Sequence, residues 1–100
     1  RSGSTYDETA RLIEQGISIE ETAKRRGIAE GTVISHLEKL AHDGRVLHID
    51  HLKPDEDRLS SMSQAFMETG GESLTPVKEL LGEDFSYDEL RLARLFLRGG

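Results

Sequence analysis

The chain has 100 residues, 32% of them charged and 35% hydrophobic, and its formal net charge is −6 at neutral pH. This length supplies one modest core and is too short for a catalytic domain with a deep cleft beside a second unit. The absence of cysteine excludes disulfides and thiolate zinc sites, and the acidic balance argues against broad nucleic-acid contact, because phosphate binding depends mainly on Lys and Arg.

Residues 1–4 read as a polar leader or a remnant of cloning. The first helix is expected to begin at Thr5, because Glu8 follows three residues later and completes a T-x-x-E capping box. Gly16 is expected to end this helix. Its apolar face consists of Thr9, Ala10, Leu12 and Ile13. This helix should brace the two that follow it.

Residues 18–40 have the spacing of a helix-turn-helix. Ser18 and Glu21 form a second capping box, which predicts a helix that begins near Ile19. Gly27 supplies the positive φ that ends this helix and turns the chain. Ala23, four residues before Gly27, leaves room for two crossing helices to approach closely.

The second helix of this motif is predicted from apolar residues at helical spacing, with Val33, Leu37 and Leu40 as its buried stripe. Ile34 lies beside the polar face, and we expect it to be half exposed. Glu30 at the helix start would repel a phosphate. The outward face is expected to present Thr32, Ser35, His36 and Lys39.

In DNA-binding proteins of this shape, the second helix lies in the major groove and its outward side chains touch phosphates and base edges. The sequence therefore predicts DNA contact through that face. Basic residues at the end of the preceding helix would flank it and form a local basic edge with Lys39 and Arg45: these are Lys24, Arg25 and Arg26. The alternatives are a plain helical hairpin, basic residues that only complement the helix dipole, and an interhelical role for His36.

Residues 45–53 follow a turn at Asp43 and Gly44, and they are expected to form an extended connector rather than a sheet. His48, Asp50 and His51 have a spacing that would bind a metal weakly. Surface histidines are the better account of this cluster.

The remainder of the chain reads as a second helical half over residues 54–98. Pro54 is expected at the first position of its first helix, followed by a break at Gly70 and Gly71. Thr75 is expected to cap a short helix that has Pro76 at its first position. The core stripe of these two helices is predicted to contain Leu59, Met62, Phe66, Val77, Leu80 and Leu81.

The last helix has the strongest start signal, because Ser86 and Glu89 form a capping box and Phe85 can pack on Leu90 as a hydrophobic staple. Ala93, Phe96 and Leu97 are expected to face the core together with Leu90. A basic stripe lies along the other side, and a solvated face is its favoured interpretation: Arg91, Arg94 and Arg98.

The predicted fold is all-α, with about six helices in one compact domain that spans residues 5–98. Within it we expect a helix-turn-helix unit over 5–44, a connector over 45–53 and a second helical half over 54–98. No nucleophile with a base, carboxylate pair, metal cage or phosphate loop can be assembled from these residues. We therefore expect no enzyme activity, metal or cofactor in this chain.

One local resemblance concerns the frame A-x-x-x-G-I-x-x-x-T-V-x-x-H-L, which runs from Ala23 to Leu37. It resembles the helix-turn-helix of LuxR-type response regulators. The sequence departs from that family at Thr22 and Arg26, where aliphatic residues are usual, and at Ala29, where a capping Ser is usual. Ile34 also replaces a common basic residue, which argues against sequence-specific promoter binding.

A longer resemblance extends over nearly all of residues 5–97. The segments TYDET, GISIEETAKRRGIAEGTVISHL, IDHL and ESLTPVKELLGEDFSYDELRL resemble the helix-turn-helix domain at the extreme C-terminus of many bacterial RecQ-family DNA helicases. Arg26 before the turn glycine and the run FSYDELR are the most specific parts. The resemblance implies an accessory module, joined by a linker to an ATP-driven 3′ to 5′ DNA unwinding motor that acts in recombination and repair.

These observations predict a non-catalytic, monomeric, cytoplasmic and nucleoid-associated module that binds DNA weakly, mostly at the backbone, without membrane contact. Residues 54–100 hold five Lys and Arg against ten Asp and Glu, whereas residues 1–53 hold eight against nine. This acidic second half favours an alternative, in which the chain binds another protein or another domain of the helicase. A LuxR-like transcription regulator is a third possibility, although it would require a dimer to bind paired half-sites.

Overall fold

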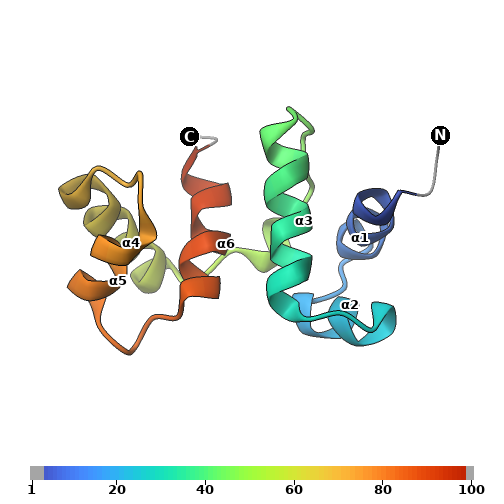
Figure 1. Cartoon of the computed structure of the whole chain (residues 1–100), viewed down its shortest axis with the longest axis horizontal. Coiled ribbons are helices and arrows are strands. Elements are labelled where there is room, and N and C mark those ends of the chain that lie inside the picture. Colours follow the sequence, from blue (N-terminus) through green and yellow to red (C-terminus); the bar gives the residue numbers. More distant parts are fainter. Residues whose placement is uncertain (1–3, 99–100) are drawn as a thin grey trace. The chain divides into compact units, whose positions relative to one another are not determined.

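A computed structural model describes residues 4–98, with the side chain of Arg98 excepted. Most of the predicted leader, and the side chain of one member of the predicted basic stripe, therefore lie outside the described residues. The described residues form six α-helices and one short 3₁₀ turn, without a β-strand (Figure 1). The predicted all-α fold is confirmed. None of these helices is long and apolar enough to cross a lipid bilayer.

Contacts between residues divide the chain into two compact units, with the boundary between Leu52 and Lys53. That boundary falls inside the connector predicted over residues 45–53. The first unit holds the helix-turn-helix, and the second holds the later helices. That residues 5–98 behave as a single domain stays a prediction.

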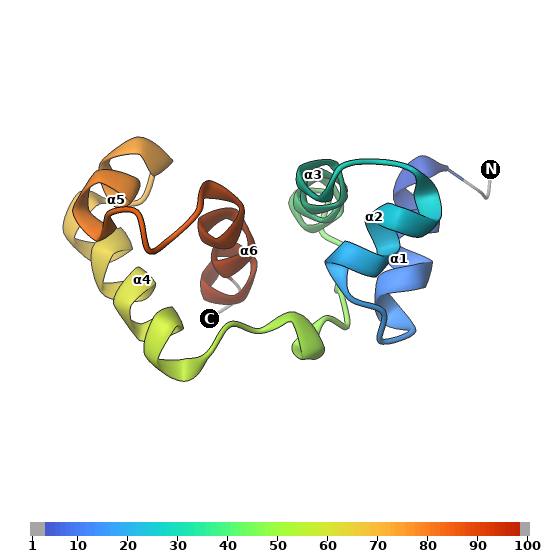
Figure 2. The same ribbon diagram turned by 90° about the horizontal axis from the view of Figure 1, so that it is seen from below.

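The first unit consists of α1 (Thr5–Glu14), α2 (Ile19–Arg26) and α3 (Glu30–His42), followed by a 3₁₀ turn (Asp50–Leu52). Both α1 and α2 pack against α3, which Figure 2 shows almost end-on. Their interface is apolar, because the buried side chains of this unit include Ala10, Ile13, Ala23, Val33, Leu37 and Leu40. This packing leaves one side of α3 exposed.

Two helix starts in the first unit can be compared with the sequence. At α1 the cap is Ser4 rather than Thr5, and its hydroxyl accepts from the N–H of Asp7 at 3.1 Å. The predicted first residue, Thr5, is confirmed, but the predicted cap was wrong by one residue, because the adjacent hydroxyl takes the capping position. At α2 the predicted cap is confirmed: the Ser18 hydroxyl accepts from the Glu21 N–H at 3.0 Å.

The connector contains no strand: residues 45–49 have no regular secondary structure, a 3₁₀ turn follows at Asp50–Leu52, and polar groups of the connector bond to α1. The Glu14 carboxylate accepts from the backbone N–H of His48 at 2.9 Å. Arg45 forms ion pairs with Asp7 at 3.1 Å and with Glu14 at 3.3 Å. Ile49 is buried beside these contacts. The connector is therefore anchored to the first unit.

The second unit consists of α4 (Glu56–Thr69), α5 (Leu74–Leu81) and α6 (Tyr87–Arg98). Each of these helices packs against the other two. Their shared core is formed by Met62, Ala65, Phe66, Val77, Leu90 and Ala93. Arg58 on α4 also connects α4 to α6, since its guanidinium donates to both carboxylate oxygens of Glu89 at 2.6 and 2.8 Å.

Three predictions for the second unit were wrong. The first helix begins at Glu56 rather than at Pro54, and the second begins after Ser73, two residues before the predicted cap at Thr75. Pro76 is tolerated one turn into α5, because the first N–H groups of a helix have no intrahelical acceptor. Leu80 is 53% exposed rather than inward, since Val77 already fills the line of α5 that faces the core. The Ser86 cap is confirmed, because its hydroxyl accepts from the Glu89 N–H at 3.1 Å.

Candidate nucleic-acid interface

The turn between α2 and α3 has the geometry that the sequence predicts. Gly27 adopts a left-handed conformation with φ of 68°, which a side chain at this position would disfavour. The next N–H, of Ile28, donates to the carbonyl of Ala23 at 3.0 Å and closes the C-terminus of α2. Ala23 itself is buried. A small buried residue and a left-handed glycine therefore set the approach of α3.

The outward face of α3 presents three of the predicted polar residues to solvent. Thr32, Ser35 and Lys39 are all exposed, at spacings of three and four that place them along one side of the helix. Ile34 is buried rather than half exposed, because the covered stripe of α3 is wider than the predicted one. The face is thus free of large apolar side chains and can accept a polar partner.

His36 lies at the edge of this face, where the structure places it between α3 and α1. Its Nδ1 atom is 2.7 Å from the Thr9 hydroxyl oxygen, and its ring meets the ring of Tyr6 edge-on at 5.0 Å. Thr9 is completely buried. The interhelical alternative for His36 is therefore realised, and a direct contact between this side chain and DNA stays a prediction.

Arg26 also turns inward, toward α1. One terminal nitrogen donates to the Thr5 carbonyl at 2.8 Å and to the Thr9 hydroxyl, and the other donates to the Thr5 hydroxyl at 3.0 Å. Because guanidinium has no acceptor, the Thr9 oxygen must accept from Arg26 and can direct its own hydrogen to His36. In that arrangement His36 Nδ1 accepts, and the proton of a neutral ring resides on Nε2.

Charge and burial agree with this arrangement. Burial lowers the pKa of His36 below its ordinary value, and the positive charge of Arg26 lowers it further. The imidazole is consequently held neutral near pH 7. The sequence placed Thr9 on the apolar face of the first helix, but it carried no signal that Arg26 and His36 would meet there.

The predicted basic edge is largely paired within the molecule. Arg25 pairs with Glu21 at 3.0 Å and Lys39 with Asp43 at 3.3 Å, each one helical turn apart. Arg45 is engaged by α1, as described above. Among the residues that the structure describes, Lys24 has no acidic partner within ion-pair distance. The face is therefore mixed in charge rather than continuously positive.

The connector histidines take part in ordinary contacts. The Nε2 atom of His51 lies 3.2 Å from the carbonyl oxygen of Ile17, and His48 binds Glu14 through its backbone. Within residues 4–98, no group of three or more His, Asp or Glu side chains is placed to hold a metal ion.

Comparison with known proteins gives the same fold assignment. A family model described as a helix-turn-helix domain matches residues 5–94. The chain belongs to this helix-turn-helix domain family. It is also 29% identical, over 96% of its length, to the ATP-dependent DNA helicase Pif1 of Psychrobacter sp. (strain PRwf-1). The chain spans 19% of that relative's length. No solved structure gives a significant match.

Proposed function

We propose that this helix-turn-helix domain is a non-catalytic accessory module of an ATP-dependent DNA helicase and that it contacts DNA through α3. The observation that carries the proposal is the exposed row of Thr32, Ser35 and Lys39 behind a left-handed Gly27 turn. Side chains of this kind bind phosphates and base edges when a helix enters the major groove. Similarity to a DNA helicase over nearly the whole chain supports the same assignment.

Internal ion pairs on this face do not prevent DNA contact. The pairs of Arg25 with Glu21 and of Lys39 with Asp43 are exposed, since each of these side chains is between 46% and 52% accessible. Pairs of this type contribute only about 0.3–0.5 kcal/mol. A DNA phosphate can therefore displace either carboxylate at little cost, while Lys24 is available without displacement. Binding through so few cations should be weak and should depend on salt.

The type of helicase motor is the finer part of the proposal. Resemblance to the C-terminal domain of RecQ-family helicases favours a RecQ-type parent, and the similar Psychrobacter protein is a Pif1 helicase. Both assignments give the parent protein an ATP-driven DNA motor. The complete reading frame that encodes this chain distinguishes them, because the motor domain carries its own sequence motifs.

A titration of labelled DNA at two salt concentrations tests the DNA contact. Forked, duplex and single-stranded DNA should each be compared at about 20 and 150 mM salt, which separates the electrostatic part of binding. The double variant Lys24→Glu and Lys39→Glu should weaken binding on all sequences alike. Each lost phosphate contact should also reduce the slope of log affinity against log salt by about one.

A second pair of variants should have the opposite effect on DNA affinity. Glu21→Gln and Asp43→Asn release Arg25 and Lys39 from their internal partners, so both changes should strengthen DNA binding. Glu72→Gln removes one negative charge from the second unit and serves as the matched control. If all three single changes raise affinity equally, only net charge matters, and α3 is not the contact surface.

The acidic second unit favours a different candidate function, which is protein binding. Its excess of acidic residues would repel DNA but attract a basic protein segment. Its exposed Leu80 offers apolar area that suits a protein surface rather than DNA. Absence of binding to every DNA form at low salt would leave this function as the better account of the chain.

A further inference from the structure

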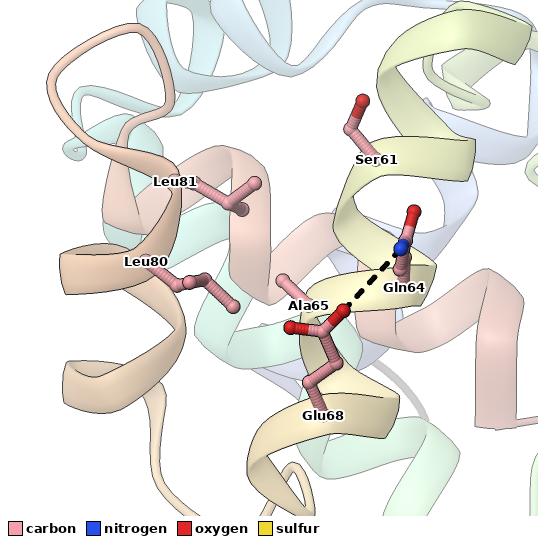
Figure 3. Close-up of a pocket in the computed structure, with 6 residues that line it drawn as sticks. All are labelled: Ser61, Gln64, Ala65, Glu68, Leu80 and Leu81. Carbon is pink, nitrogen blue, oxygen red and sulfur yellow. Dashed lines mark hydrogen bonds between the residues drawn. The ribbon is translucent and has the colours of Figure 1, made fainter.

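The second unit carries an open groove between α4 and α5. Its more enclosed part is a hollow of about 210 Å³, and Figure 3 shows side chains of both helices around it. A wider hollow of about 440 Å³ adjoins it, because Glu68 and Leu80 line both. Ligand sites for small molecules usually enclose about 300–1,000 Å³ and bury most of the ligand. The enclosed part is smaller than that range and suits a single side chain.

The floor and one wall of the groove are apolar. Ala65 on α4 is buried at the base, and Leu80 and Leu81 on α5 project toward α4 (Figure 3). Leu81 also packs against the core of the unit, whereas Leu80 remains 53% exposed. An exposed leucine beside a hollow provides apolar area for an aliphatic side chain of a partner.

The rim of the groove is acidic. Glu68 and Glu79 line it, and Gln64 donates to Glu68 at 3.3 Å. In the described part of the chain, neither carboxylate lies within ion-pair distance of a Lys or Arg. The nearby Lys78 is directed elsewhere, since its ammonium donates to the Gly82 carbonyl at 3.1 Å. The two rim charges are therefore available to an external cation.

We propose that this groove binds a basic amphipathic helical segment of a protein. An aliphatic side chain of that segment would enter the hollow beside Leu80, and its Lys or Arg residues would pair with Glu68 and Glu79. Helical peptides bind grooves between two helices in this way, with apolar anchors for affinity and charges for orientation. The same carboxylates repel DNA, so this surface is separate in chemistry from α3. The inference uses residues of the second unit alone and does not depend on the proposed DNA contact.

The test uses a synthetic probe of defined chemistry. A fluorescent helical peptide of Leu, Ala and Lys, about 12 residues long with Leu at i, i+3, i+4 and i+7, spans roughly 18 Å. It is titrated into the intact chain and followed by anisotropy, with amide chemical shifts to locate it. We expect saturable binding, with shifts centred on α4 and α5. A peptide in which Glu replaces Lys should not bind, and a scrambled peptide of the same composition should bind more weakly.

Variants of the groove decide whether its residues carry the binding. Leu80→Ser should reduce the affinity for the peptide roughly tenfold, as expected for the loss of an anchor contact. The double variant Glu68→Gln and Glu79→Gln should reduce the affinity for the peptide about three- to tenfold. Met67→Ser is the matched apolar control, because Met67 is 80% exposed on α4 but does not line either hollow. Glu20→Gln in the first unit is the matched charge control, and neither control should alter affinity.

Three outcomes would overturn the inference. They are equal binding of the Lys and Glu peptides, equal affinity of the groove and control variants, and shifts centred on α3. Concentration-dependent dimerisation that Leu80→Ser abolishes would assign the groove to a second copy of the chain instead. Circular dichroism of each variant separates loss of binding from loss of fold, and every side chain altered in these variants is exposed.

Discussion

His36 on α3 and Thr9 on α1 are joined by a hydrogen bond of 2.7 Å that lies beside the outward face of α3. Arg26 on α2 donates to the same threonine oxygen, so one buried hydroxyl links α1, α2 and α3 of the first unit. The arginine can only donate, so the Thr9 hydroxyl hydrogen is left to point at His36, and the lowered pKa of His36 favours the neutral ring that can accept it. The contact between α3 and α1 is therefore coupled to the charge of one imidazole.

This relationship predicts a stability that depends on pH. In the folded chain the pKa of His36 is lowered, first by burial and then by the charge of Arg26. The unfolded chain consequently binds this proton at a higher pH than the folded chain does, and stability rises with pH wherever that difference exists. The free energy of unfolding in urea should be highest above the ordinary pKa of 6.5 and should fall as the pH drops below it. The decrease in unfolding free energy should end once the pH lies below the pKa that His36 has in the folded chain.

Two variants identify the group responsible. His36→Gln keeps a polar side chain that does not titrate. The free energy of unfolding of this variant should therefore fall less between pH 7.5 and 5 than that of the parent chain. Arg26→Gln removes the neighbouring positive charge, and the pKa of His36 measured by NMR should rise toward its ordinary value. An imidazole of His36 that titrates above 6.5 in the parent chain would contradict the prediction.

The turn glycine gives a second prediction. Gly27 has φ of 68°, and a Cβ built at this position meets no atom within 4 Å. The cost of Gly27→Ala is therefore conformational rather than steric, and it should be about 1 kcal/mol of unfolding free energy. Gly27→Asn is the matched control, since asparagine tolerates the left-handed region better and should cost less. Urea unfolding measures both, and equal losses would show that φ is not the cause.

Local signals in the sequence were sufficient to place the motif. The hydroxyl of Ser18 and the glycine at position 27 mark the two ends of α2 because capping and positive φ depend on residues within one helical turn. The exposure of Thr32 and Lys39 followed from helical period alone. Where two neighbouring hydroxyls compete for a cap, as Ser4 and Thr5 do, the sequence cannot choose between them, and the predicted cap is displaced by one residue.

Contacts between distant residues could not be predicted in the same way. Arg26 looks like a surface cation at the end of a helix, yet it bonds Thr5 and Thr9, which are 21 and 17 residues away. A helical period places it on a side of α2 but does not identify the helix that will cover that side. The predicted burial of Leu80 was wrong for a related reason, because a helix as short as α5 has few residues that define its buried face.

Thr22 provides a prediction of increased stability. This residue is completely buried on α2, and its hydroxyl has no hydrogen-bond partner among the described residues. An unsatisfied buried hydroxyl is destabilising, whereas a methyl group of similar shape is not. Thr22→Val should therefore raise the free energy of unfolding by about 1 kcal/mol. Thr9→Val is the matched control with the opposite sign, since the Thr9 hydroxyl has two partners, and a loss of stability with Thr22→Val would contradict the argument.

The uncapped start of α3 gives the last prediction. Ala29 occupies the cap position with φ of −75° and ψ of 154°, which is the backbone conformation of a capping residue, but its side chain has no acceptor. Ala29→Ser should therefore stabilise the chain by about 1 kcal/mol, because the hydroxyl can accept from an N–H of the first turn. Ala29→Val tests the mechanism, since it adds a side chain without an oxygen and should give no gain. If serine and valine have equal effects in urea unfolding, side-chain bulk rather than a hydrogen bond is responsible, and the helix start is already satisfied by solvent.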